Sequence, residues 1–201
     1  FEDFATWKFA VDPLWRVLGV TEAQPLMRQI IARIQLRLQA DGPYPEMVSH
    51  FGPFAPISGE SSRLRHSWTA DRFTVWAGRS DDQRSYSFEG IGWNGSIAGR
   101  RCKHLHIDDI QSLKSLDQTD EMFNRFRQDM VSRPGPRGRT SINGTRVGPN
   151  DFYERLTDEW DDELLTVIKY PAIVTNQVTG EREPCWPYDP VTDSGYTMEM
   201  L

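Results

Sequence analysis

The sequence has little cysteine, no long apolar run and no excess of positive charge. Two cysteines in 201 residues cannot form the disulfide framework of a small secreted domain, so we expect an intracellular protein. Nowhere do about 20 apolar residues stand together, as a membrane-spanning helix requires, so we expect a soluble protein with no membrane partner. The formal net charge is −6, so any contact with nucleic acid must come from a local basic patch.

The chain contains enough apolar and aromatic residues to fold. Hydrophobic residues make up 38% of it, and it has seven tryptophans and ten phenylalanines, whereas disordered chains are poor in aromatics. A chain of this length lies within the usual size of one domain. We therefore expect one globular unit over residues 1–201.

Hydrophobic periodicity predicts an α/β fold. Expected helices end at Asp12-Pro13, cover 26–38 and 117–132, and run from an Asn150-Asp151 cap to Thr157. Expected strands cover 16–20, 103–107, 139–143 and 164–170, with a β-hairpin formed by 72–76 and 84–89 and an extended surface connection at 43–62. Strands that alternate with helices favour a mainly parallel sheet flanked by helices.

Polar residues end two of these strands. Ligands of such sheets bind beyond the carboxyl ends of the strands, where Asp108-Asp109 and the segment Asn143 to Arg146 are expected. Neighbouring side chains on an extended chain point in different directions, so the two carboxylates can do different work. We expect Asp108 to hold Mg²⁺ and Asp109 to activate a water molecule; the alternative is that Asp109 only caps the following turn.

The order of several short motifs resembles one known family over essentially the whole chain. The motifs are Gly99-Arg100-Arg101, His106-Ile107-Asp108-Asp109, Asn143-Gly144-Thr145-Arg146, the segment from Asn150 to Leu156, and the segment from Val167 to Ile173. Together they resemble the ATPase domain of the large terminase subunit of tailed bacteriophages, which packages DNA. Each motif is weak alone, and the specificity lies in their order.

The resemblance implies a P-loop ATPase of the additional-strand class that uses ATP and Mg²⁺. Such a subunit forms a homo-oligomeric ring, works with the small terminase subunit and docks on the portal protein. It drives double-stranded DNA into the procapsid in the bacterial host cytoplasm. The resemblance also implies that Asn143, Gly144, Thr145 and Arg146 couple the nucleotide state to DNA movement, and that Arg100 or Arg101 is an arginine finger acting on a neighbouring subunit.

The chain departs from the family pattern in three ways. It contains no Gly-Lys dipeptide, so residues 1–201 lack the G-x-x-x-x-G-K-[ST] loop that cradles phosphates, and we expect that loop upstream of Phe1. The strand that leads into Asp108-Asp109, which the resemblance identifies as the Walker B segment, is polar, with Lys103, His104 and His106. Ala98 stands where many relatives carry arginine. The family's nuclease domain would follow Leu201.

Three other patterns carry alternative interpretations. A basic cluster of five arginines lies across a helix end and the following loop (Arg125, Arg127, Arg133, Arg137, Arg139). It is interpreted either as a contact with DNA phosphates or a neighbouring subunit, or as a solvated face. The segment Gly90 to Gly95 matches G-x-G-x-x-G, but no helix is expected after it, so we interpret it as a flexible turn near the nucleotide. Cys102, His104 and His106 are too far apart along one strand face to gather on zinc.

Two further functions remain open from the sequence. A metal-dependent nuclease could gather two metal ions with the acidic groups Asp81-Asp82, Asp108-Asp109 and Asp161 to Glu163. The second function is that of a non-enzymatic fragment, which binds DNA or the portal protein and hydrolyses no nucleotide. Metal-dependent DNA cleavage would indicate the first, and the absence of both activities the second.

Overall fold

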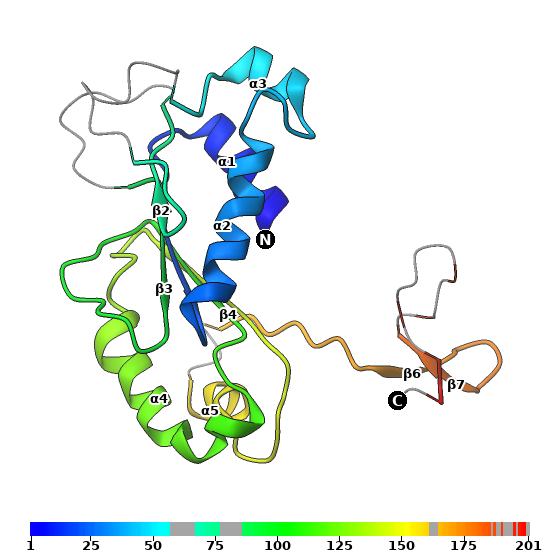
Figure 1. Cartoon of the computed structure of the whole chain (residues 1–201). Coiled ribbons are helices and arrows are strands. Elements are labelled where there is room, and N and C mark those ends of the chain that lie inside the picture. Colours follow the sequence, from blue (N-terminus) through cyan, green and yellow to red (C-terminus); the bar gives the residue numbers. More distant parts are fainter. Residues whose placement is uncertain are drawn as a thin grey trace. The chain divides into compact units, whose positions relative to one another are not determined.

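The structure is a computed structural model in which residues 1–56, 67–76, 86–160, 165–185, 187, 190, 195 and 197–199 are described. The chain divides into two compact units, Phe1–Asp158 and Glu159–Leu201. The first contains a five-stranded sheet with helices packed around it (Figure 1). The second contains a two-stranded sheet of β6 (Ile173–Thr175) and β7 (Arg182–Pro184).

The five-stranded sheet has the order β2-β3-β1-β4-β5. Its strands are β1 (Val17–Thr21), β2 (Arg72–Phe73), β3 (Phe88–Gly92), β4 (His104–Asp108) and β5 (Arg139–Asn143). β1 pairs in parallel with both β3 and β4, β4 pairs in parallel with β5, and only β2 is antiparallel. The prediction of a mainly parallel sheet flanked by helices is therefore confirmed.

The first three helices, α1 (Glu2–Val11), α2 (Gln24–Arg37) and α3 (Pro45–Phe51), contribute to one hydrophobic core. Ala5 and Phe9 of α1 and Ile31 and Ile34 of α2 are fully buried in it, together with Phe88 of β3. α2 comes so close to the sheet that a Cβ on Gly90 would lie 2.2 Å from Met27 Cγ. Gly90 and Gly92 of the G-x-G-x-x-G match belong to β3, so only residues 93–95 form a turn.

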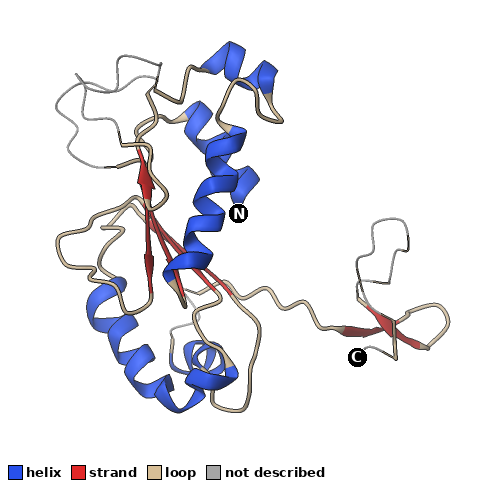
Figure 2. Ribbon diagram, viewed as in Figure 1, coloured by secondary structure: helices blue, strands red, loops and turns tan. Residues whose placement is uncertain are grey.

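A second group of elements lies away from α1 and α2 (Figure 2). It contains η1 (Leu113–Gln118, 3-10), α4 (Thr119–Arg125), η2 (Phe126–Met130, π-helical) and α5 (Phe152–Glu159). The ring of Phe152 is fully buried and contacts the rings of Trp93, Phe123 and Phe126, with centroid distances of 6.1, 6.2 and 5.7 Å. These aromatic contacts join α5 to α4 and to the end of β3.

Several predicted elements differ from the structure. Residues 45–51 form α3, where the sequence predicted an extended connection, and Pro45 stands at a helix start, which proline tolerates. The strand predicted at 164–170 is wrong over its described part, because 165–170 pair with no strand there. β2 and β3 pair antiparallel in the region of the predicted hairpin, but residues 77–85 lie outside the described part of the chain, so the hairpin itself stays a prediction.

Candidate functional site

Three strands of the sheet bring polar residues together at their carboxyl ends. In the β1–β4 pair Thr21 lies opposite Asp108, and in the β4–β5 pair Asp108 lies opposite Asn143. The chain leaves β1 towards β3 and leaves β4 towards β5, on opposite sides. Such a point of divergence opens the crevice in which α/β proteins bind ligands. The two strand ends that the sequence singled out therefore meet at the position where a ligand site is expected.

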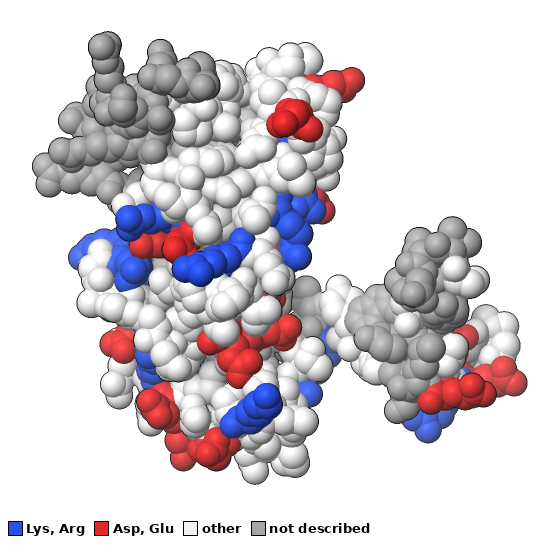
Figure 3. Space-filling view, viewed as in Figure 1, with Lys and Arg blue, Asp and Glu red and all other residues white. Residues whose placement is uncertain are grey.

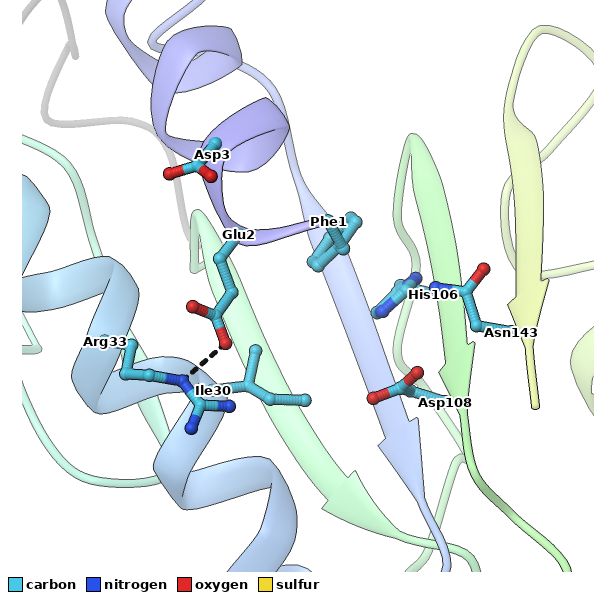
Figure 4. A pocket seen from close by; sticks show the side chains of 8 residues that line it. All are labelled: Phe1, Glu2, Asp3, Ile30, Arg33, His106, Asp108 and Asn143. Carbon is cyan, nitrogen blue, oxygen red and sulfur yellow. Dashed lines mark hydrogen bonds and ion pairs between the residues drawn. The ribbon is translucent and has the colours of Figure 1, made fainter. Parts of the chain in front are cut away.

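A pocket of about 240 Å³ adjoins Asp108 and Asn143. Figure 4 shows its lining, which comes from the start of α1, from α2, and from the ends of β4 and β5 (Phe1, Glu2, Asp3, Ile30, Arg33, His106, Asp108, Asn143). Both oxygens of Glu2 form ion pairs, Oε1 with Arg33 at 2.6 Å and Oε2 with Arg37 at 2.9 Å. The acidic side chain at the start of α1 is therefore neutralised within the fold.

Asp108 is half-buried at the edge of this pocket. Burial raises the pKa of its carboxyl group, and the neighbouring charge of Asp109 acts in the same direction, while a hydrogen bond with the Asn143 side chain opposes them. A cation beside Asp108 would offset this desolvation. Mg²⁺ at nucleotide sites is usually held by one or two carboxylates, with waters and phosphates as its other ligands, so the carboxylate of Asp108 fits that ion, while the side-chain amide of Asn143 donates to Asp108.

Asp109 has a left-handed backbone, with φ of 42°. Its amide donates to the carbonyl of Asn143 at 3.1 Å, and its own carbonyl accepts from the amide of Glu22 at 3.2 Å. These bonds hold the residue between the ends of β1 and β5. Its side chain is exposed and does not line the pocket of Asp108, as the expected divergence of the two carboxylates requires.

Two imidazoles and a hydroxyl stand on the same face of the sheet as Asp108. His104 Nε2 and His106 Nδ1 lie 2.7 and 2.9 Å from Ser141 Oγ, and the ring of Phe1 stacks on His106. Burial lowers the pKa of His104 to about 4 and that of His106 to about 3. Sequence reasoning assigned these histidines no part in the site, although strand alternation places residues 104, 106 and 108 on one face.

The segment after β5 is fixed to the start of α5. Arg146 forms ion pairs with Asp151 at 2.8 Å and with Glu154 at 2.8 Å. Gly144 and Thr145 are exposed, and a Cβ on Gly144 would lie 2.0 Å from Tyr153 Oη. Of the four predicted coupling residues, Asn143 therefore reaches the pocket and Arg146 holds the following loop.

The two arginine-finger candidates lie at the other end of β4. Arg100 and Arg101 precede β4, whereas Asp108 ends it, and Arg100 forms an ion pair with Glu89 of β3 at 3.1 Å. A five-residue strand at about 3.3 Å per residue separates its two ends by roughly 16 Å. Neither arginine can reach the carboxylates of its own chain. An arginine-finger role for Arg100 or Arg101 therefore requires the site of a neighbouring subunit.

The basic cluster divides into inward and outward members. The guanidinium of Arg125 donates to the carbonyl of Gly95 at 2.6 Å and lies over the ring of Trp93, so this arginine packs within the fold. Arg127 lies over the ring of Phe123, and Arg133 donates to the carbonyl of Asp129. Arg137 and Arg139 are exposed.

The face of the molecule drawn in Figure 3 carries charges of both signs. On the face shown in Figure 3, the Lys and Arg side chains stand among Asp and Glu side chains. Any DNA contact by this cluster would rest mainly on its exposed members, Arg127, Arg137 and Arg139.

Two of the three acidic groups of the nuclease hypothesis, 81–82 and 161–163, lie outside the described residues. Within the part that is described, no group of three or more His, Cys, Asp or Glu side chains is arranged to hold a metal ion. In that same part, no helix is long and apolar enough to cross a membrane.

Comparison with known proteins gives no family. No protein-family model matches the chain, and no curated protein shows significant sequence similarity to it.

Proposed function

We propose that the chain is the nucleotide-hydrolysing core of a viral DNA-packaging motor, a P-loop ATPase of the additional-strand class. The observation that carries the proposal is the pairing of Asp108 with Asn143 at the carboxyl ends of adjacent parallel strands. Asp108 belongs to the terminase-like Walker B segment, His106 to Asp109, and Asn143 is the first residue of the coupling motif. Two motifs that lie 35 positions apart in the sequence thus meet in one pocket, as the proposed chemistry requires.

In this proposal the two carboxylates have separate roles. Asp108 would hold Mg²⁺ in the pocket, and the ion would offset the negative charge of the nucleotide phosphates. Asp109 is exposed beside the pocket and accepts a proton from the attacking water. Asn143 touches both, because its side chain bonds Asp108 and its carbonyl bonds the amide of Asp109.

The start of α1 supports the proposed place of the phosphates. Phe1 and Glu2 line the same pocket as Asp108, and the start of a helix attracts anions through its free amides. The proposal requires a Gly-Lys-Ser or Gly-Lys-Thr loop leading into α1. β5 is the last strand of the sheet among the described residues, so a strand carrying that loop has an open edge to join.

The remaining roles follow from the same proposal. The subunits form a ring on the portal protein, with the small terminase subunit and double-stranded DNA as partners, in the bacterial host cytoplasm. Arg100 or Arg101 acts on the site of a neighbouring subunit, and the exposed arginines 137 and 139 contact DNA phosphates or that neighbour. Ring formation is needed for the first of these roles, because the arginines lie far from their own carboxylates.

The decisive experiment replaces Asp109 with asparagine. Asparagine accepts the left-handed backbone as readily as aspartate, so Asp109→Asn removes the base without straining the fold. The assay uses a polypeptide that adds to residues 1–201 the natural sequence leading into α1. We expect Mg²⁺-dependent ATP hydrolysis with kcat lowered about 10²- to 10⁴-fold in the variant, and ATP binding unchanged.

Asp117→Asn is the matched control, because Asp117 is exposed on η1 and lies outside the site. It should leave kcat unchanged. Full turnover in Asp109→Asn would show that the wrong carboxylate is assigned. An extended polypeptide without any ATPase activity would overturn the proposed function, and metal-dependent cleavage of DNA by residues 1–201 would indicate the nuclease.

A further inference from the structure

The first turn of α5 is attached to both loops that leave the candidate site. One loop follows Asp109 at the end of β4, and the other follows Asn143 at the end of β5. Three consecutive residues, Asp151, Phe152 and Tyr153, make the attachments. None of them lines the pocket, so α5 acts on the site through these loops and not by direct contact.

Gln111 joins the β4 loop to α5. Its side chain is buried, with 4% exposed, and both of its polar atoms form hydrogen bonds within the fold. Oε1 accepts from the amide of Phe152 at 2.6 Å, while Nε2 donates to Thr119 Oγ1 at 2.7 Å. A buried amide with donor and acceptor both engaged fixes the loop in one arrangement, because breaking it leaves buried polar groups without partners.

Tyr153 stands between the two loops. The amide of Ile110, next to Asp109, donates to Tyr153 Oη at 3.2 Å. The same ring lies against Gly144, next to Asn143, so closely that any Cβ there would overlap it. Burial raises the pKa of Tyr153, and the nearby charges of Asp109 and Asp108 raise it further, so its hydroxyl stays protonated. It therefore serves as a hydrogen-bonding spacer and not as an acid or base.

Asp151 joins the β5 loop to the same turn. Its carboxylate is fully buried and accepts from the amides of Val147 at 2.8 Å, Gly148 at 3.3 Å and Glu154 at 2.9 Å. The last of these bonds caps α5, since a helix start leaves such amides unpaired. One helical turn thus holds both loops at fixed positions.

We propose that Tyr153 and Gln111 are positioning residues that keep Asp109 in register with Asn143. The inference rests on the proposed function for its chemical consequence, but the positioning itself is a property of residues 1–201. This register is defined by the hydrogen bond from the amide of Asp109 to the carbonyl of Asn143, which Tyr153 and Gln111 help to maintain. When Tyr153 loses its hydroxyl, the loop after Asp109 loses its attachment and this neighbouring bond weakens with it.

Amide hydrogen exchange of residues 1–201 tests the positioning. In Tyr153→Phe we expect the amides of Ile110 and Asp109 to exchange about two- to tenfold faster, as loss of one hydrogen bond allows, with β1 unchanged. Thr157→Val is the matched control, because it removes a hydroxyl bond within α5, from Thr157 Oγ1 to the carbonyl of Glu154. Acceleration confined to Ile110, no acceleration, or an equal effect in Thr157→Val would each overturn the inference.

Kinetics of the extended polypeptide test the chemical consequence. A displaced Asp109 should lower kcat of Tyr153→Phe by about 10- to 100-fold with KM for ATP unchanged. The value of kcat is expressed per folded molecule, because a smaller folded fraction would also lower the apparent kcat without changing KM. Gln111→Leu should act in the same direction. An unchanged kcat would overturn the consequence for catalysis. If the parent polypeptide hydrolyses no ATP, the proposed function fails, and hydrogen exchange still decides the positioning.

Discussion

At the residue scale, the left-handed backbone of Asp109 is the most informative feature of the site. Aspartate tolerates a left-handed backbone better than most residues other than glycine, and such a conformation persists where the surroundings impose it. Here the hydrogen bonds to Asn143 and Glu22 impose it. Their effect is to turn the second carboxylate out of the strand, away from the pocket of Asp108.

The shared hydroxyl of Ser141 explains how two buried histidines are accommodated next to Asp108. A hydroxyl has one proton and two lone pairs, so it donates to one imidazole and accepts from the other. The ring that accepts the Ser141 proton must be unprotonated at the contacting nitrogen, and the other ring must carry a proton at its contacting nitrogen. Protonation of both rings would leave one N–H competing with the Ser141 proton.

These histidines predict a loss of stability in acid. In the folded chain the pKa of His104 is about 4 and that of His106 about 3, both below the ordinary value of 6.5. Between pH 6.5 and these lower values the unfolded chain therefore binds more protons than the folded chain. The free energy of unfolding is therefore highest above pH 6.5. It falls as the pH drops, by up to about 1.4 kcal/mol per pH unit for each imidazole. Urea unfolding at pH 7, 6, 5 and 4 measures this slope.

His106→Gln isolates the contribution of one imidazole. The variant has a lower stability at neutral pH because packing changes, so the slope and not the absolute value is compared. We expect the free energy of unfolding of this variant to depend less steeply on pH between 6.5 and 4 than that of the parent. A slope in His106→Gln equal to that of the parent would contradict the buried neutral state.

At the scale of elements, the start of α5 depends on Asp151 far more than on its partner Arg146. Burial disfavours the charged form of Asp151, yet hydrogen bonds from the amides of Glu154, Val147 and Gly148 and from Arg146 keep its pKa low. Asp151 has no exposed surface, whereas the Arg146 side chain is 51% exposed. The stability of the fold should therefore depend strongly on the Asp151 carboxylate and only weakly on the Arg146 guanidinium.

This asymmetry predicts different effects for the two alanine variants. Asp151→Ala leaves three backbone amides without their acceptor and should lower the free energy of unfolding by about 2–3 kcal/mol. Arg146→Ala removes a half-exposed charge and should lower it by about 1 kcal/mol or less. Urea denaturation at neutral pH measures both. Equal effects would mean that the ion pair, and not the helix cap, holds the loop.

The sequence predicts elements well where local pattern decides them. The strand at 139–143 has its predicted bounds, and Asp151 caps a helix as expected. The predicted helix at 117–132 is instead divided into 3-10, α and π segments, because η1 is fixed by Ser112 and Ser115 side chains that bond backbone groups and Glu22. The strand at 164–170 had the right composition, but strand formation also requires a partner, which sequence pattern does not supply.

The sequence predicted the residues that line the candidate site at the strand ends, but not the residues that hold its loops in place. Asp108 and Asn143 could be found because parallel strands place their carboxyl ends at one edge. Gln111 and Tyr153 could not, because their bonds join residues 41 and 43 positions apart and depend on how α5 packs. A polar residue directly after the buried Ile110 was the only local signal for Gln111.

At the scale of the whole molecule, the first unit contains the five-stranded sheet and every residue of the candidate pocket. Its two groups of aromatic side chains, around Phe88 and around Phe152, lie within residues 1–158. A domain of this length buries enough apolar surface to fold alone.

We therefore expect a polypeptide of residues 1–160 to retain the sheet. Its amide NMR signals from β1, β4 and β5 should coincide with those of residues 1–201. Residues 1–150 form the matched control, because this cut removes the buried Phe152 and the cap Asp151. Loss of such an aromatic side chain alone costs about 3–5 kcal/mol, a large part of the 5–15 kcal/mol that stabilises a typical domain, so this polypeptide should unfold. Native signals from 1–150 would show that α5 does not hold the loops of the site, and loss of signals from 1–160 would show that the first unit depends on the second.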